Sequence, residues 1–355
     1  MAGRPRRREV GLLEVAREAG VSTATVSNTL NRPDIVTPAT RGRVMAAIQR
    51  LDFVPNHAAG TLRRGHNRLF GLVVPDITNP FYAEIARGVT DAAESSGLAV
   101  VLCNSQDDPA RERRQLEMLA EHRAAGALVV PIGADRRRLD RLRRMGVHLV
   151  LIDRRSAPGD GCSVVIEDRA GGSLAMAHLI DTTTGDGPLA IVNSSRTIPQ
   201  CAERDLGARD ALDAAGSDPD RLVCVEIGLM TTAQGVLAAD QLARSARPPR
   251  GVFCTNDQLA IGVIRGLSAA GLRVPEDVAV VGYGDLAIAV DAPVPLTTVE
   301  LPKYSLGQSA VAKLMTELAE GEHHRHSTTV FPPSLVVRES APAAGAASAP
   351  GPASA

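Results

Sequence analysis

A run of short polar side chains near the amino end of the chain could hydrogen-bond the edges of nucleic-acid bases. The run opens a predicted helix, and Ser22 is suited to cap it. Hydroxyl and amide side chains of this length let a helix lie deep in the major groove of DNA. The alternative is an ordinary amphipathic helix, because helix pairs joined by a glycine turn are common. The candidate DNA contacts of this helix are Ser22, Thr23, Ala24, Thr25, Ser27, Asn28 and Asn31.

A second set of polar and aromatic side chains follows the carboxyl ends of predicted parallel strands, where doubly wound folds bind small ligands. Phe81 and Tyr82 can stack on the face of a ligand, and the surrounding amide, carboxylate and guanidinium groups suit hydroxyl groups. This combination predicts a sugar or a related polyol, although Asp257 could be only a helix N-cap. The candidate ligand contacts are Asn79, Phe81, Tyr82, Asn104, Asp153, Arg154, Asn256, Asp257 and Asp285.

Motifs for catalysis, cofactor binding or metal binding are weak by comparison. The chain has no GxSxG nucleophile elbow. Gly282–Ala287 resembles GxGxxA, but Pro293 and Pro295 follow too soon for a crossover helix and strand, so we expect no dinucleotide site. The histidine-rich run His323–His326 could bind a metal, yet the sequence shows no other ligand cluster, which favours a solvated loop. We therefore expect no enzyme, no cofactor and no metal site.

The elements that must position these side chains change in character along the chain. Helical spacing of apolar residues predicts three short helices between residues 12 and 51, which form an all-α helix-turn-helix head. From residue 70 to 282, strand-like apolar runs alternate with helical segments, which predicts a two-lobed α/β domain with doubly wound parallel sheets. The predicted segments are a disordered basic stretch (1–9), the helix-turn-helix domain (10–54), a hinge helix or linker (55–67), the two-lobed domain (68–338) and a disordered tail (339–355).

Charge is distributed unevenly over the 355 residues, whose net charge is -1. Residues 1–68 carry twelve Arg and five acidic residues (+7), and the remainder carries 27 basic and 35 acidic residues (-8). A basic head on an acidic body fits a nucleic-acid partner for the head. The five cysteines form no CxxC pair, which predicts reduced thiols. Neither a signal-peptide pattern nor a long apolar run occurs, so we expect a cytoplasmic protein with no membrane partner.

Longer stretches of the sequence resemble the LacI/GalR family of bacterial repressors. The resemblance begins with VAREAGVSTATVSNTLN at residues 15–31 and continues with Thr40-Arg41 and with VPN at 54–56. In the body it includes NPFY at 79–82, TNDQLA at 255–260, VPEDVA at 274–279 and PLTTV at 295–299. It covers nearly all of residues 12–338 and implies a periplasmic-binding-protein-like body that binds an effector between its lobes.

The resemblance also implies roles for individual residues. Residues 55–63 match a hinge helix that folds on operator DNA, with Leu62 as an apolar wedge inserted from the minor groove. The alternative is a plain interdomain linker. Arg204, in the motif RDLG, resembles the arginine that bonds effector hydroxyls or carboxylates in this family, and its alternative is a surface ion pair. The candidate DNA contacts of the hinge are Asn56, His57, Ala59, Leu62 and Arg63.

Three departures from the family pattern bear on specificity. Asn28 stands where Arg is usual near the end of the recognition motif, and Asn pairs with adenine rather than guanine. Gly60 costs the hinge helix about 1 kcal/mol relative to alanine, which makes its folding more dependent on DNA. Gly284 stands where many members have an acidic ligand contact, and Asp285 follows it.

The sequence thus predicts a transcriptional regulator, a repressor of genes for sugar or related metabolism. A homodimer would place two recognition helices on a pseudo-palindromic operator. Effector binding would change the angle between the lobes and so spread or join the paired hinge helices. The alternatives are an α/β enzyme and a solute-binding protein that act on a sugar-like ligand. The lack of catalytic motifs weighs against an enzyme, and the lack of a signal-peptide pattern together with the basic head weighs against a solute-binding protein.

Overall fold

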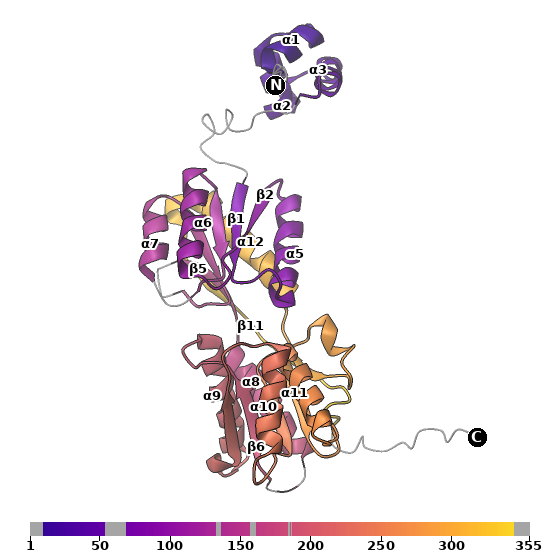
Figure 1. Ribbon diagram of the computed structural model, residues 1–355. Coiled ribbons are helices and arrows are strands. Elements are labelled where there is room, and N and C mark those ends of the chain that lie inside the picture. The colour runs from indigo at the N-terminus through magenta and orange to yellow at the C-terminus, as the bar shows by residue number, and fades with distance from the viewer. Residues whose placement is uncertain are drawn as a thin grey trace, which may run out of the picture. The chain divides into compact units, whose positions relative to one another are not determined.

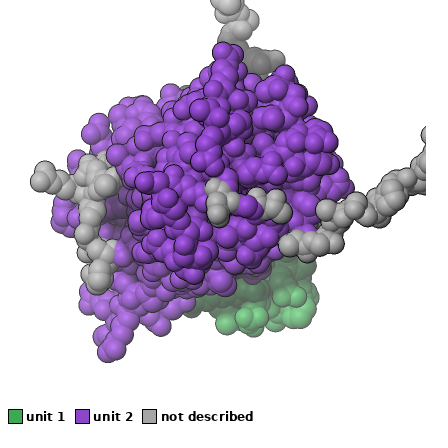
Figure 2. Space-filling model, turned by 90° about the horizontal axis from the view of Figure 1, so that it is seen from below, with its two compact units in different colours: residues 1–67 green, residues 68–355 purple. Residues whose placement is uncertain are grey.

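The computed structural model describes residues 10–53, 69–132, 136–156, 161–183, 185 and 187–343 (Figure 1). The chain divides into two compact units, residues 1–67 and residues 68–355, which Figure 2 shows in different colours. The smaller unit contains the three predicted helices of the head. The larger unit contains two α/β lobes.

Three short helices form the head, and their apolar faces make one core. Val15, Val26, Val44 and Ala47 are fully buried, with Phe53 beside them. Gly20 ends the first helix with a φ of 64°, a left-handed conformation that glycine adopts without steric cost. Helices this short are marginal alone, so mutual packing must hold them. The elements are α1 (Leu12–Ala19), α2 (Thr23–Asn31), the 3-10 turn η1 (Pro33–Ile35) and α3 (Pro38–Arg50).

The first lobe is built on a parallel sheet with the strand order β11-β5-β4-β3-β1-β2. Phe70, Leu72 and Val74 of β1 join the core on one face with α5 and α12, whereas Val73 joins the core on the other face with α6 and α7 (Figure 1). Burial on both faces explains the continuous apolar strands. The elements are β1 (Leu69–Val74), α5 (Pro80–Ser95), β2 (Ala99–Asn104), α6 (Pro109–Glu121), β3 (Gly126–Val129), α7 (Arg136–Arg144), β4 (His148–Ile152), β5 (Cys162–Ile166), α12 (Lys303–Glu320) and β11 (Thr328–Phe331).

The second lobe repeats this plan with the strand order β12-β10-β9-β8-β6-β7. All its strands are parallel except β12, which pairs antiparallel with β10. Helices α8 and α9 pack on one face, and α10 and α11 pack on the other. The elements are α8 (Asp168–Thr182), β6 (Leu189–Asn193), α9 (Pro199–Ala214), β7 (Leu222–Glu226), α10 (Thr232–Ala243), β8 (Gly251–Cys254), α11 (Asp257–Ala269), β9 (Ala279–Gly284), β10 (Thr297–Glu300) and β12 (Ser334–Val336), with 3-10 turns η2 (Pro219–Arg221), η3 (Ala287–Ala289) and, after α12, η4 (Gly321–His323).

The chain passes between the lobes after β5, after β10 and after β11. The strand-like runs predicted between residues 70 and 282 form strands β1 to β9, and the predicted fold class is confirmed. The predictions missed β10, β11 and β12, which are short and rich in Thr and Ser. Three connecting segments allow the lobes to change their angle by small rotations in a few residues.

One predicted boundary is wrong, because the carboxyl-terminal tail does not begin at residue 339. Ser340 and Ala341 are fully buried in the second lobe. The Ser340 hydroxyl donates to the carbonyl of Val280 (2.6 Å) and accepts from the amide of Thr297 (2.8 Å). The segment therefore caps the sheet although its composition resembles that of the residues after it.

Candidate functional site

The recognition helix α2 is anchored by its buried side and presents the predicted polar residues on the other. Val26 and Thr29 are buried, and the Thr29 hydroxyl donates to the carbonyl of Thr25 (2.9 Å). Ser22 caps the helix, because its hydroxyl oxygen accepts from the amide of Thr25 (3.1 Å). The seven predicted contacts are exposed or partly exposed: Ser22, Thr23, Ala24, Thr25, Ser27, Asn28 and Asn31.

Two hydrogen-bonded pairs of polar side chains lie on this surface. The hydroxyls of Ser22 and Thr25 lie 2.9 Å apart, and the Asn31 amide donates to the Ser27 hydroxyl (3.3 Å). Such weak, exposed hydrogen bonds can be replaced by bonds to base edges or phosphates at little cost. The predicted hinge contacts Asn56, His57, Ala59, Leu62 and Arg63 lie outside the described residues.

A cavity of about 340 Å³ in the larger unit lies at the carboxyl ends of strands from both lobes. Its polar groups are carboxylates, amides and guanidinium groups, and its apolar groups include three aromatic rings, Phe81, Tyr82 and Tyr283. Of the predicted ligand contacts, those that line it are Asn79, Phe81, Tyr82, Asp153, Arg154, Arg204 and Asn256.

Three predicted contacts do not line this cavity. Asp257 is fully buried, and its carboxylate accepts from the Thr298 hydroxyl (2.6 Å) and from the amide of Leu286 (2.7 Å). The N-cap of α11 is Asn256, whose side chain accepts from the amide of Leu259 (2.8 Å). Asp257 therefore fastens the loop after β9, and it is neither a cavity residue nor the cap.

The other two are turned to local partners. Asp285 forms an ion pair with Arg338 (2.7 Å), so that Gly284, its neighbour, is the residue that lines the cavity there. Asn104 accepts a hydrogen bond from the amide of Gln106 at its side chain and from Gln115 at its backbone carbonyl (2.7 Å). Asn104 ends β2 and Asp285 follows β9, and neither side chain lines the cavity.

Arg204 lies in the cavity wall as part of a buried ionic cluster. Its guanidinium donates to Asp168 (2.8 Å) and to the carbonyl of Thr255 (2.8 Å), and lies 3.9 Å from the centre of the Tyr283 ring. The Tyr283 hydroxyl donates to the same Asp168 oxygen (2.8 Å). Burial works to lower the pKa of Arg204, but Asp168, Tyr283 and other nearby groups together outweigh it and raise the pKa overall, so the cation is permanent. The alternative of a surface ion pair does not apply, since only 8% of Arg204 is exposed.

Asp153 has an unusual environment for a carboxyl group. Burial, followed by the nearby carboxylate of Asp168, raises its pKa from 3.8 to about 7. Gln200 of the other lobe donates to one of its oxygens (2.9 Å), and the other oxygen, Oδ1, is buried with no hydrogen-bond partner among the described residues. Oδ1 is thus a polar atom that a ligand hydroxyl could satisfy.

Two family models match separate parts of the chain. Residues 11–56 match the model of bacterial regulatory proteins of the lacI family, and residues 189–341 match that of a periplasmic binding protein-like domain. The repressor PurR of Photobacterium profundum is 34% identical over 330 residues, which are 92% of this chain and 97% of PurR. The ribose operon repressor of Escherichia coli (strain K12) is 35% identical over 311 residues, 86% of this chain and 92% of that protein.

The chain belongs to the LacI family. Solved structures of the family share its fold. The Lac repressor dimer bound to operator and the anti-inducer ONPF superposes with a TM-score of 0.82 at 25% identity, covering 95% of this chain and all of that one. The regulator CelR in complex with cellobiose gives a TM-score of 0.69 at 32% identity, covering 93% of this chain and 99% of CelR.

As a LacI-type transcriptional repressor, this chain joins a helix-turn-helix head to an effector-binding body. Within the described residues, no helix is both long enough and apolar enough to cross a membrane.

Sequence reasoning missed several residues that this LacI-family chain brings to the cavity. Gln200 and Asp107 line it, and Asp168 holds the Arg204 guanidinium at its wall. Gln200 follows Pro199 in the first turn of α9, which comes after the loop at the carboxyl end of β6, and its place after a strand was the available signal. Asp168 begins α8 shortly after the carboxyl end of β5, so the same signal was available for it.

Proposed function

We propose that this repressor binds a pseudo-palindromic operator and that a sugar of about monosaccharide size, bound in the cavity between the lobes, sets its affinity for DNA. The observation that carries the proposal is the cavity itself. Its volume of about 340 Å³ lies at the lower end of the range for small-molecule sites, about 300–1,000 Å³. Aromatic faces beside carboxylate, amide and guanidinium groups suit a ring that carries hydroxyls.

The effector acts by bridging the lobes. Asn79, Asp153 and Arg154 come from the first lobe, and Gln200, Arg204 and Asn256 from the second, so a ligand that bonds both sets stabilises one lobe angle over others. The Gln200–Asp153 hydrogen bond already links the lobes in this structure. A ligand that replaces it changes the contact on which the angle depends, and the hinge helices carry the change to the head.

Support for a sugar also comes from the family. One similar structure holds cellobiose, and another, a LacI-family regulator from Enterococcus faecium, holds ribose. Burial, followed by the Asp153 carboxylate, raises the pKa of Tyr82 far above its ordinary value, so that its hydroxyl stays neutral and able to donate to a ligand oxygen. As a regulator of chromosomal genes the protein works in the cytoplasm.

The operator is contacted in both grooves. The polar side of α2 enters the major groove, where Asn28 favours adenine. The hinge around Leu62 enters the minor groove, unstacks one base step and kinks the duplex at a cost of a few kcal/mol.

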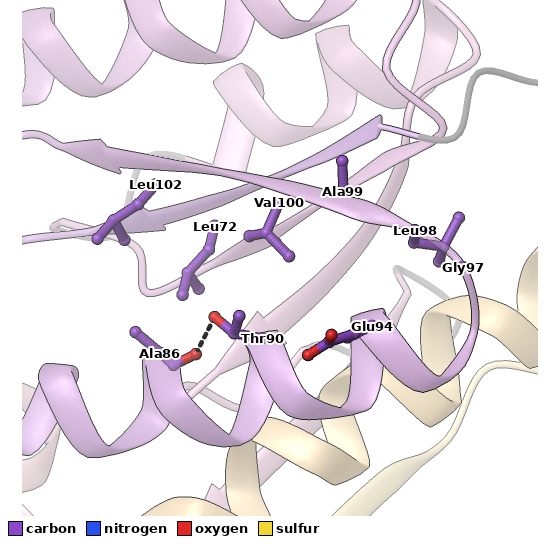
Figure 3. A pocket seen from close by; sticks show the side chains of 9 residues that line it. All are labelled: Leu72, Ala86, Thr90, Glu94, Gly97, Leu98, Ala99, Val100 and Leu102. Atoms are coloured by element: carbon purple, nitrogen blue, oxygen red, sulfur yellow. Dashed lines mark hydrogen bonds between the residues drawn. The ribbon is translucent and has the colours of Figure 1, made fainter. Parts of the chain in front are cut away.

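The protein works as a homodimer through the edge of its first lobe. β2 is an edge strand, and its Leu102 is 50% exposed. Figure 3 shows that Ala86, Thr90 and Glu94 of α5 face Val100 and Leu102 of β2 across a groove of about 420 Å³. An open edge strand with an apolar face is a ready interface for a second copy, and the similar Lac repressor structure is a dimer. Two heads on a two-fold axis then match a pseudo-palindrome.

The decisive experiment measures the fluorescence anisotropy of labelled DNA from upstream of the protein's own gene, against a scrambled duplex, at about 150 mM salt. A preference of about 10³-fold or more is expected for a specific reader. Titration with individual sugars then identifies the effector as the sugar that changes this affinity. The proposal allows the effector either to raise or to lower the affinity for DNA. Equal weak binding to both duplexes, with and without sugars, and to fragments selected from random DNA, contradicts the proposal.

A further inference from the structure

A cluster of potential metal ligands lies in the first lobe, among residues that the cavity between the lobes does not use. Cys162 begins β5, Glu317 lies near the end of α12, and His324 and His326 follow η4 on the way to β11. One ligand atom from each of the four lies within 4.8 Å of those of the other three. The sequence predicts a solvated loop at the histidine run. Cys162 is more than 160 residues distant along the chain, so local spacing does not reveal it as a further ligand.

The distances inside the cluster fit a tetrahedral zinc ion. Bonds of about 2.0–2.3 Å to nitrogen, oxygen and sulfur place tetrahedral ligand atoms about 3.3–3.8 Å apart. The Cys162 sulfur lies 3.1 Å from Nε2 of His324 and 3.8 Å from Nδ1 of His326. Nδ1 of His326 in turn lies 3.9 Å from Oε2 of Glu317. The side chains therefore need only small shifts to surround one ion.

Two of the four ligands are oriented by a second hydrogen-bonding group, as is usual in protein zinc sites. His324 turns Nε2 to the cluster, while its Nδ1 lies 2.7 Å from the carboxylate of Glu320 one turn earlier. Oε1 of Glu317 lies 3.0 Å from Nδ1 of His148. The side chains of His324 and Glu317 are 5% and 9% exposed, so the ring and the carboxylate are held in a largely dry place.

One buried carboxylate oxygen in the cluster lacks a hydrogen bond to the described residues. Oε2 of Glu317 is buried and has no hydrogen-bond partner among the described residues. Buried carboxylate oxygens are normally satisfied, so an orphan marks an absent ligand or water. Here it faces the cluster, towards His326.

We propose that Cys162, Glu317, His324 and His326 bind one Zn²⁺ ion. The donor set of one thiolate, two imidazoles and one carboxylate is that of a closed, four-coordinate zinc site. A thiolate and a carboxylate neutralise the two charges of the ion, so the loaded site adds no net positive charge beside the nearby cation Arg143. The ion joins the starts of β5 and β11, the strands that lead into two of the three connections between the lobes. It thereby fixes the amino ends of those two strands relative to each other.

Metal content of the full chain tests this assignment. Untagged protein is stripped with a chelator, reloaded with Zn²⁺ alone, gel-filtered and assayed by mass spectrometry of the metal. About one Zn²⁺ per chain is expected for the native protein. His324→Gln and Cys162→Ser should lose it. The matched controls His323→Gln, an exposed histidine of the same run, and Cys224→Ser, an exposed thiol, should keep it.

Two further measurements keep the test decisive if a buried substitution impairs folding. His326→Gln changes a ring that is 29% exposed, and it should also lose the ion while the protein keeps its circular dichroism. Co²⁺ in place of Zn²⁺ should give a thiolate-to-metal charge-transfer band in the native protein and in His323→Gln, but none in Cys162→Ser. Native protein that retains no Zn²⁺, or folded His324→Gln and His326→Gln that retain as much as the controls, overturns the proposal.

Discussion

Replacing Asp153 by Asn should make the stability of the effector-binding body less dependent on pH. The carboxyl of Asp153 is enclosed at the cavity, close to Asp168, and these surroundings raise its pKa to about 7. In the unfolded chain the same group titrates near its ordinary value of 3.8. The asparagine side chain has the shape of the neutral acid and keeps an oxygen that can accept from Gln200.

The sign and size of the effect follow from proton linkage. Because the folded pKa lies above the unfolded one, the folded state binds more protons between about pH 4 and 7. The stability that this group contributes is fully present below about pH 4 and is lost as the pH rises through about 7. The difference between 3.8 and about 7 corresponds to about 4 kcal/mol in total, of which about 2 to 3 kcal/mol falls between pH 5 and pH 8. The advantage of Asp153→Asn should grow by that amount over this interval.

Urea unfolding followed by tyrosine fluorescence measures this difference. The chain has no Trp, and its three Tyr residues (Tyr82, Tyr283 and Tyr304) all lie in the larger unit, so the signal reports the body rather than the head. Asp181→Asn, at an exposed position, is the control and should follow the native pH profile. Parallel profiles for the native protein and Asp153→Asn between pH 5 and pH 8 would refute the reasoning, since they would mean that Asp153 titrates alike in both states.

Further substitutions test the other parts. Leu62→Ala should weaken specific operator binding far more than nonspecific binding, because only the specific complex contains the wedged base step; equal losses in anisotropy titrations would contradict a wedge. Arg204→Ala should abolish the effector response and also lower the free energy of unfolding by about 3–5 kcal/mol, because it leaves Asp168 buried without its partner. Adding Asp168→Asn should recover part of that stability in urea but not the response. Leu102→Asp should convert the dimer to a monomer in analytical ultracentrifugation and weaken operator binding. The control Met118→Asp, on α6 at the other face of the lobe, should have neither effect. An unchanged sedimentation coefficient for Leu102→Asp would exclude β2 from the interface.

The elements of the fold were predictable because their signals are local. Ser22 caps α2 and Gly20 ends α1 as their types and positions predict. The central parallel strands are buried on both faces, so their continuous apolar runs stand out in the sequence. The short strands β10, β11 and β12 were missed because they owe their strand conformation to neighbours in the sheet rather than to an apolar run of their own.

The cavity was predictable only in outline. The sequence predictions relied on the rule that the carboxyl ends of strands line a crevice. Most of the contacts predicted in this way do line the cavity, including Asp153 and Asn256. It failed for Asp257, which lies one residue beyond Asn256 and is turned inward to Thr298. One position along a helix rotates a side chain by about 100°. A place after a strand end therefore predicts that a residue lies near the cavity, but it does not predict where the side chain points.

The sequence by itself determined the two-part organisation, the basic head, the strand and helix pattern and the family. Each of these depends on residue types, or on periodicity within a few turns of chain. Only the tertiary structure decided that Arg204 is a buried partner of Asp168, that Ser340 belongs to the second lobe, and that Cys162 meets His324 and His326. Those contacts depend on which strands become neighbours, and no local spacing records the pairing of segments far apart in the chain.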